Sequence, residues 1–83
     1  MRVLKFYADW CQPCKALTKV VDGVKDQIGI PVEEIDIDKQ REFAMTHGIR
    51  SVPTMIVLDE NHQVLRRKVG MMNEKELLEF IKG

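Results

Sequence analysis

The chain has 83 residues, of which 45% are apolar and 31% charged, a composition typical of a globular domain and not of a disordered segment. Its 13 basic and 13 acidic side chains cancel, which argues against binding to nucleic acid or to an anionic membrane surface. No apolar run approaches the roughly 18 residues that cross a bilayer, and the N-terminal residues are charged too early for a signal peptide. We therefore expect one domain over residues 1–83, a soluble monomer of the cytoplasm.

The first half of the chain predicts a strand, a helix and a second strand. Residues 2–8 are rich in β-forming side chains and predict the first strand. From Pro13 to Ile28 the apolar residues recur at helical spacing, which predicts one helix with Gly23 as its weak point. Residues 31–37 then alternate in side-chain character, as a strand with two different faces does.

The next segments predict a short helix and two further strands. Asp38 is expected to cap a helix that runs to about His47 and ends at Gly48, with that glycine in the left-handed conformation. The apolar run at 54–58 predicts a strand covered on both faces. Residues 63–69 alternate and carry basic side chains, as expected of an outer strand protected against edge pairing.

The last element is a helix, which Asn73 and Glu76 are expected to begin with a capping box. The order of elements is therefore β-α-β-α-β-β-α. Strands separated by helices form parallel pairs, and the last two strands form a hairpin. We predict an α/β fold with three layers around a mixed sheet of four strands, one for each β in that order.

Cys11 and Cys14 are the only cysteines of the chain. A disulfide between them closes so short a loop that it stabilises the fold by only about 2 kcal/mol, so the pair is a poor structural staple. Cys11 follows a strand and precedes a helix, where free backbone N–H groups and the helix dipole stabilise an anion. A thiol there is more acidic than a free cysteine. We expect Cys11 to attack a substrate disulfide, and Cys14, one turn away and more buried, to resolve the mixed disulfide.

Half of a zinc site has the same Cys-x-x-Cys pattern, and taken alone the pattern fits both chemistries about equally well. A zinc site would need further ligands, and only His47 and His62 are available. They fall at the end of one helix and in a turn, without ligand-like spacing between them. The position of the cysteine pair between a strand and a helix favours redox chemistry and no metal.

Several segments of the chain match one known family, in order and with plausible spacing. They are ADWCQPCK at 8–15, IDID at 35–38, GIRSVPT at 48–54 and KVG at 68–70. The first resembles the thioredoxin active-site segment, Trp-Cys-Gly-Pro-Cys-Lys, and the likeness covers nearly the whole chain. The family's usual extra first strand and helix are missing, so the chain is similar to a minimal thioredoxin of the phage or archaeal type. The resemblance implies a thioredoxin-like fold.

The resemblance also implies a substrate-binding rim around the sulfurs. Pro53 would be a cis-proline facing the cysteines, which leaves the backbone of Val52 free to pair with an extended substrate. A trans proline at the start of a strand is the alternative. Gln12 departs from the family's usual glycine and leaves the reduction potential open. The implied rim consists of Trp10, Gln12, Pro13, Val52, Pro53, Gly70 and Met71.

The largest departure from the family lies behind the second cysteine. Thioredoxins usually have a buried aspartate there, helped by a lysine on the neighbouring strand. Aligned on Cys11, the aspartate position is Lys5 and the lysine position is Glu34, so the two charges are exchanged. We hypothesise a Lys5–Glu34 pair under the active site, in which Glu34 accepts the proton of Cys14 and Lys5 favours the thiolate. A weak surface ion pair is the alternative.

The residues and the resemblance together predict an enzyme that reduces protein disulfides through a Cys-Gln-Pro-Cys dithiol. Such an enzyme needs no bound cofactor because the electrons reside on sulfur, and the resemblance implies resupply by a flavin- and NADPH-dependent thioredoxin reductase. Ribonucleotide reductase is a candidate substrate by family alone. One alternative is a glutaredoxin-like protein recharged by glutathione, whose usual Pro-Tyr pair and double glycine are absent here. The other is a non-catalytic partner-binding or zinc-binding module.

Overall fold

The computed structural model describes residues 1–83 and contains a four-stranded mixed sheet with helices on both sides. The elements are β1 (Arg2–Tyr7), α1 (Gln12–Gly23), α2 (Lys25–Ile28), β2 (Val32–Asp36), α3 (Arg41–Thr46), β3 (Thr54–Leu58), β4 (Val64–Val69) and α4 (Glu74–Lys82). The strand order across the sheet is β2-β1-β3-β4, with β1 parallel to β2 and the other neighbours antiparallel. The predicted α/β fold class is confirmed.

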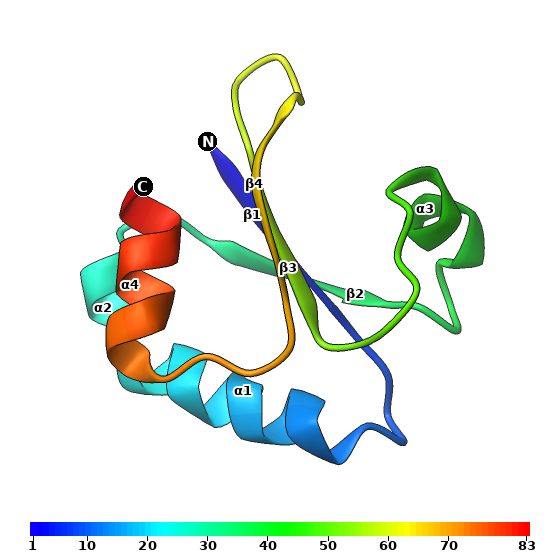
Figure 1. Cartoon of the computed structure of the whole chain (residues 1–83), viewed down its shortest axis with the longest axis horizontal. Coiled ribbons are helices and arrows are strands. Elements are labelled where there is room, and N and C mark those ends of the chain that lie inside the picture. The colour runs from blue at the N-terminus through cyan, green and yellow to red at the C-terminus, as the bar shows by residue number, and fades with distance from the viewer.

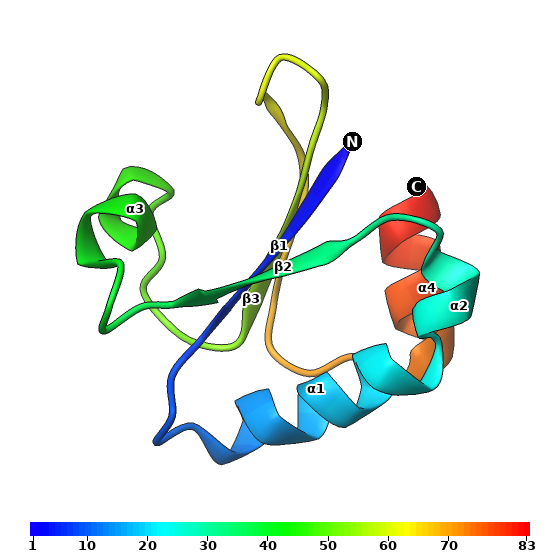
Figure 2. The same cartoon turned by 180° about the vertical axis from the view of Figure 1, so that it is seen from behind.

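The helices divide between the two faces of the sheet and give three layers. α1, α2 and α4 lie on one face, and α3 lies on the other (Figure 1, Figure 2). Alternate side chains of β1 point to opposite faces of the sheet. Val3 packs in the larger core with α1 and α4, whereas Leu4 and Phe6 pack in the smaller core beside α3. α1 therefore packs against the same strand whose end leads into it.

The central and outer strands have the exposure that their sequences predict. Every residue of β3 is buried, because this strand lies between β1 and β4 and is covered on both faces. β4 lies at the edge of the sheet and is mostly exposed, and its side chains include Arg67 and Lys68. Charged side chains on an edge strand oppose the addition of another strand there.

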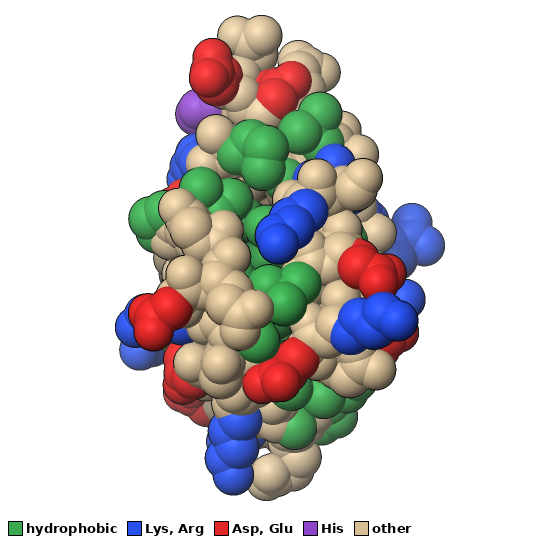
Figure 3. All heavy atoms as spheres, turned by 90° about the vertical axis from the view of Figure 1, so that its left-hand side faces the viewer, with side chains coloured by type: hydrophobic (Ala, Val, Ile, Leu, Met, Phe, Trp, Pro, Cys, Tyr) green, Lys and Arg blue, Asp and Glu red, His purple; other side chains and the backbone are tan.

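The surface on the α4 side carries basic and acidic side chains mixed with apolar groups, and no single charged patch dominates that face (Figure 3). This agrees with the equal numbers of basic and acidic residues. None of the helices combines the length and the apolar character that a bilayer span requires.

The prediction of one continuous helix to Ile28 is wrong. Val24 has φ −121° and ψ 13°, outside the helical region, so α1 ends at Gly23 and the short α2 follows. Glycine has a weak helix preference, and the start of α4 packs closely against this point: a Cβ at Gly23 would lie 2.5 Å from Glu74 Oε2. The break therefore falls directly after the residue of this segment with the weakest helix preference.

The prediction that Asp38 caps the third helix is also wrong. α3 begins only at Arg41, and its N-cap Gln40 makes no side-chain capping hydrogen bond. Asp36 instead accepts the N–H groups of Asp38 and Lys39 at 2.9 and 3.3 Å, which tightens the turn after β2 and leaves the Asp38 carboxylate free for another partner. The predicted helix end is confirmed, since Gly48 has φ 67°.

The predicted start of α4 is confirmed in detail. The Asn73 side chain accepts the Glu76 N–H at 2.8 Å, and the Glu76 carboxylate accepts the Asn73 N–H at 3.0 Å. This reciprocal capping box satisfies backbone donors that the helix itself leaves unpaired.

Candidate active site

The two cysteines lie where the end of β1 turns into the start of α1. The Cys11 N–H donates to the Ala8 carbonyl at 3.1 Å and closes the turn. Cys11 is the N-cap residue of α1, and its Sγ accepts a hydrogen bond from the Cys14 N–H at 3.1 Å. Pro13 stands in the first helical turn, where a missing N–H leaves no helical hydrogen bond unmade. The first sulfur thus sits at a helix start, among groups that stabilise a negative charge.

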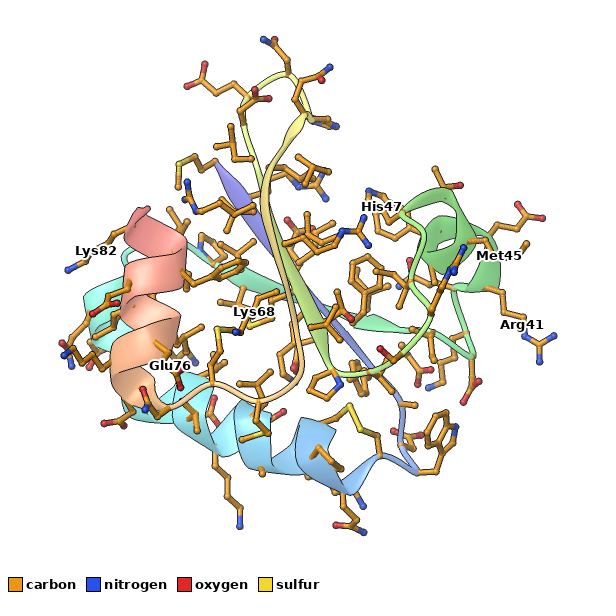
Figure 4. The ribbon with its side chains drawn as sticks, in the orientation of Figure 1. Arg41, Met45, His47, Lys68, Glu76 and Lys82 are labelled. Atoms are coloured by element: carbon orange, nitrogen blue, oxygen red, sulfur yellow. A yellow bond between two sulfur atoms is a disulfide. The ribbon has the colours of Figure 1, made fainter.

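Cys11 and Cys14 are joined by a disulfide, visible as the yellow bond beside α1 in Figure 4. Their Cα atoms are 5.3 Å apart, within the usual range for bonded cysteines. The structure therefore describes the oxidised protein. Cys14 is 2% exposed and Cys11 is 5% exposed, so the predicted order of burial is confirmed, by a narrow margin.

The loop before β3 faces the disulfide. The Val52–Pro53 peptide bond is cis, as the resemblance implied. Cys11 Sγ lies 3.7 Å from the Val52 carbonyl oxygen, and the Pro53 carbonyl accepts the Gly70 N–H at 2.8 Å. The fold thereby brings the Val52–Pro53 loop next to Cys11 from a distant part of the chain, and Gly70 is attached to the same loop through Pro53.

Three exposed side chains neighbour these residues in the sequence. Trp10 is 67% exposed, and its indole Nε1 donates to Asp38 Oδ2 at 3.0 Å. Met71 follows Gly70 and is 44% exposed, and Gln12 is exposed at the first turn of α1. Large apolar side chains left open beside a reactive group form a surface on which a partner can bind.

The hypothesised ion pair is present beneath the disulfide. Lys5 and Glu34 are paired across β1 and β2, and Lys5 Nζ donates to Glu34 Oε1 at 2.8 Å. The side chain of Lys5 is 1% exposed, whereas that of Glu34 is 45% exposed. The pairing is confirmed, and the two partners differ: the ammonium is enclosed by the protein and the carboxylate reaches solvent.

Thr18 connects this ion pair to the dithiol, and the sequence analysis missed it. Lys5 Nζ donates to Thr18 Oγ1 at 2.5 Å, and the Thr18 hydroxyl donates to the Cys14 carbonyl at 3.1 Å. The signal was available in the sequence, because Thr18 lies four positions after Cys14 and so shares its helix face. A polar residue on the face of a helix that packs against a sheet needs a buried partner, and here Lys5 is that partner.

A cavity of about 160 Å³ is bordered by Glu34 of the ion pair and by Cys14 of the dithiol. Its walls are formed by Tyr7, Ala8, Asp9, Cys14, Lys15, Thr18 and Glu34. Most of its lining surface is apolar, but Asp9, Thr18 and Glu34 contribute polar groups and the volume is sufficient for water. Glu34 and Cys14 therefore border one common space. A larger cavity of about 220 Å³ between α1, α2 and β2 shares Thr18 and Glu34 but contains neither cysteine.

Tyr7 also lines this cavity, and its pKa is shifted. Burial raises the pKa of the phenol, and the carboxylates of Asp36, Asp9 and Glu34 raise it further. Its ring faces Lys5 Nζ, which lies 5.3 Å from the ring centroid. Tyr7 therefore stays neutral at physiological pH and forms part of the wall.

The two histidines weighed as zinc ligands have other surroundings. His47 Nδ1 donates to the Phe43 carbonyl at 2.9 Å, and its ring packs against Phe43 and Phe6. His62 lies in the connection between β3 and β4. No three or more His, Cys, Asp or Glu side chains come together in an arrangement that could hold a metal ion.

Comparison with known proteins connects this geometry to one family. A family model described as Thioredoxin matches residues 1–83. The curated thioredoxin of Rickettsia felis is 33% identical over 81 residues, which cover 95% of this chain and 76% of the relative. The thioredoxin of Bacillus subtilis is 32% identical over 78 residues, which cover 92% of this chain and 74% of the relative.

Solved structures agree with the sequence comparison. A mutant thioredoxin from Halobacterium salinarum is 34% identical and superposes with a TM-score of 0.87, covering 96% of this chain and 70% of that chain. Thioredoxin-2, described as a component of malaria parasite protein secretion machinery, is 33% identical and also has a TM-score of 0.87, covering 96% of this chain and 79% of that chain.

Proposed function

Because the chain belongs to the thioredoxin family and is a thiol–disulfide oxidoreductase that acts as a protein disulfide reductase, we propose that Cys11 is its nucleophile and Cys14 its resolving thiol. The observation that carries this assignment is that Cys11 is the N-cap of α1 and that its sulfur accepts a hydrogen bond from the Cys14 N–H. In the reduced protein the same N–H and the helix dipole favour the Cys11 thiolate, which is the reactive form.

The reaction is a two-step exchange of sulfur–sulfur bonds. The Cys11 thiolate attacks a substrate disulfide, so that a Cys11–substrate bond forms, the substrate bond breaks, and the released sulfur takes a proton from solvent. Cys14 then loses its proton and attacks Cys11. The Cys11–Cys14 bond forms, the mixed bond breaks, and the second substrate sulfur leaves as a thiolate that takes a proton from solvent. Two electrons pass from the dithiol to the substrate, and the protein reaches the disulfide state described above.

The exposed rim supports binding of an extended segment of the substrate. Trp10 and Met71 offer apolar contacts, and the backbone of Val52, next to the cis Pro53, is the edge along which such a segment would pair. Gly70 has no side chain to obstruct the approach. Gln12 and Pro13 complete the proposed rim on the α1 side.

Glu34 is proposed to accept the proton of Cys14 in the second step. The shared cavity and the partial exposure of its carboxylate support this role, since the proton can pass through water to Glu34 and on to solvent. In the same proposal Lys5 favours the Cys14 thiolate.

Glu34→Gln tests the proposed proton transfer. We expect release of substrate from the mixed disulfide to slow, while the first attack by Cys11 keeps its rate. Glu33→Gln is the matched control, because Glu33 is the neighbouring residue of β2 and pairs with Arg2. If Glu34→Gln releases substrate at the same rate as the unsubstituted protein at every pH, Glu34 is not the proton acceptor.

Resupply of electrons is proposed to come from a flavin- and NADPH-dependent thioredoxin reductase, with no cofactor held by this chain. Protein disulfides are the substrates, and ribonucleotide reductase is one candidate by family. We propose that the protein works as a monomer in the cytoplasm, where thiols are kept reduced.

Reduction of insulin disulfides tests the function as a whole. The protein should accelerate the reaction with thioredoxin reductase and NADPH, and Cys11→Ser should abolish it. A protein that is driven only by glutathione and glutathione reductase would be of the glutaredoxin-like class. Turnover that survives Cys11→Ser would contradict the assignment of the nucleophile.

A further inference from the structure

Lys5 is the most deeply buried charged side chain of the protein, at 1% exposure. Its ammonium donates to both Glu34 Oε1 and Thr18 Oγ1, and the Thr18 hydroxyl donates to the Cys14 carbonyl. A positive charge therefore lies two hydrogen bonds from the backbone of the resolving cysteine. The proton transfer proposed above uses Glu34 and does not explain why the cation is the enclosed member of the pair.

The other charges near this space are screened or already engaged. The titratable side chains that line it are Tyr7, Asp9, Lys15 and Glu34, and Asp36 and Lys39 act on Tyr7 from outside it. Glu34 reaches solvent, Asp9 and Lys15 are exposed, and water weakens the fields of all three. Asp36 directs its carboxylate to backbone N–H groups. The ammonium of Lys5 is paired with Glu34, but it is itself enclosed by the protein, where a charge is screened least, whereas the Glu34 carboxylate is partly open to solvent.

From this geometry we propose that Lys5 raises the reduction potential of the Cys11–Cys14 couple. The inference rests on the redox function proposed above and adds the direction in which the couple is tuned. Only the reduced protein carries thiolates, so a buried cation lowers the free energy of the reduced state and does little for the disulfide state. A couple whose reduced form is stabilised is a weaker reductant and a stronger oxidant.

The direction of tuning selects a class of substrate. The reduced protein transfers its two electrons spontaneously only to disulfides whose potential is higher than its own. Strained or exposed disulfides have such potentials, whereas the buried structural disulfides of stable proteins do not. Lys5 therefore shifts the preference of the protein toward labile disulfides of the regulatory or catalytic kind.

Exchange with glutathione measures this effect. The oxidised protein and two glutathione molecules yield the dithiol and glutathione disulfide, so the equilibrium constant follows from the fraction of protein reduced at each glutathione ratio. We expect Lys5→Met to lower that constant about tenfold, which corresponds to a fall of about 30 mV in the reduction potential. Methionine is an unbranched apolar residue that suits the buried site, and Glu34 can turn to solvent.

Two control variants separate the charge at Lys5 from general effects. Lys19→Met removes the same charge from the exposed face of α1 and should change the constant less than about twofold. Glu34→Gln removes the counter-charge and should leave the constant equal or higher. An unchanged constant in Lys5→Met, or an equal fall in Glu34→Gln, overturns the inference.

A measurement that keeps Lys5 in place covers the case in which Lys5→Met does not fold. In Cys11→Ser, Cys14 is the only thiol, and its titration can be followed by the ultraviolet absorbance of the thiolate. We expect Cys14 to ionise at a lower pH than free cysteine in the same buffer, despite its burial; ionisation at the same or a higher pH overturns the inference. Failure of the unmodified protein to reduce insulin would instead contradict the proposed function.

Discussion

The pKa of Tyr7 responds to the burial and the charges near the dithiol. Burial and the nearby carboxylates raise its pKa, so we expect the phenol to ionise above its usual value of about 10. Its contribution to stability is then fully present below about pH 10 and is lost as the pH rises through the folded-state pKa. Because the chain has one tyrosine, ultraviolet absorbance of tyrosinate reports this group alone.

The same titration in urea provides the reference for Tyr7, since the unfolded chain should ionise near the ordinary value. A folded protein whose tyrosine ionises at or below that value would contradict the described burial of the ring and its position among Asp36, Asp9 and Glu34.

The sequence predicts some of the residue contacts at the site and misses others, and Thr18 and Asp38 are two that it misses. The exchanged charges at Lys5 and Glu34 were visible from alignment of the motif, and their ion pair is present. Thr18 was passed over because a threonine in an apolar stripe has no partner until the sheet is placed beneath it. Asp38 was assigned to the wrong structure because its partner, the Trp10 indole, comes from a different turn of the chain.

At the level of the elements, two glycines are expected to respond differently to the same substitution. Gly48→Ala should destabilise the protein by about 1 kcal/mol, because Gly48 has φ 67° and a side chain is strained there although space is free. Gly23→Ala should cost nothing or stabilise by up to about 1 kcal/mol, because the only close atoms belong to the flexible end of Glu74.

Urea denaturation of both glycine variants, followed by circular dichroism, gives the two free energies of unfolding. Each variant serves as the control for the other, since both add one methyl group. Equal losses at the two positions would contradict the conformational argument.

The capping box of α4 is a second test at this level. Asn73→Ala removes the side chain that accepts the Glu76 N–H, and we expect a loss of about 1 kcal/mol in the free energy of unfolding. Asn61→Ala is the matched control, because Asn61 is exposed in the connection between β3 and β4. A loss in Asn61→Ala as large as that in Asn73→Ala would show that the capping interaction is not the cause.

For the whole molecule, stability depends on the larger core between the sheet and the helices of the α1 face. Leu77 of α4 is fully buried in this core, so Leu77→Ala should cost about 2 to 5 kcal/mol. A domain of this size has a total stability of only about 5 to 15 kcal/mol, so the variant should be close to unfolding. Thermal and urea denaturation measure the loss.

Leu65→Ala makes the same chemical change on β4, where Leu65 is 46% exposed. We expect a change within about 0.5 kcal/mol. A loss in Leu77→Ala as small as that expected for Leu65→Ala would mean that α4 contributes less to the core than its packing indicates.

Local rules were sufficient for most of the architecture. Alternation and helical spacing predicted the strands and the order of elements, because side-chain direction repeats every two residues in a strand and about every 3.6 in a helix. Capping chemistry predicted the start of α4 and the end of α3, because both depend on groups within a few residues. The redox pair was predictable for the same reason, since a strand, two cysteines and a helix start are adjacent in the chain.

Contacts between distant segments were decided by packing alone. The hydrogen bond between Trp10 and Asp38 joins two turns that are far apart in the chain, and the loop that contains cis Pro53 meets Cys11 only in the folded protein. The enclosure of Lys5 with the exposure of Glu34 depends on how α1 covers β1 while β2 stays at the edge of the sheet. Burial is a property of the assembled layers, and no local pattern states which member of a charged pair the layers will cover.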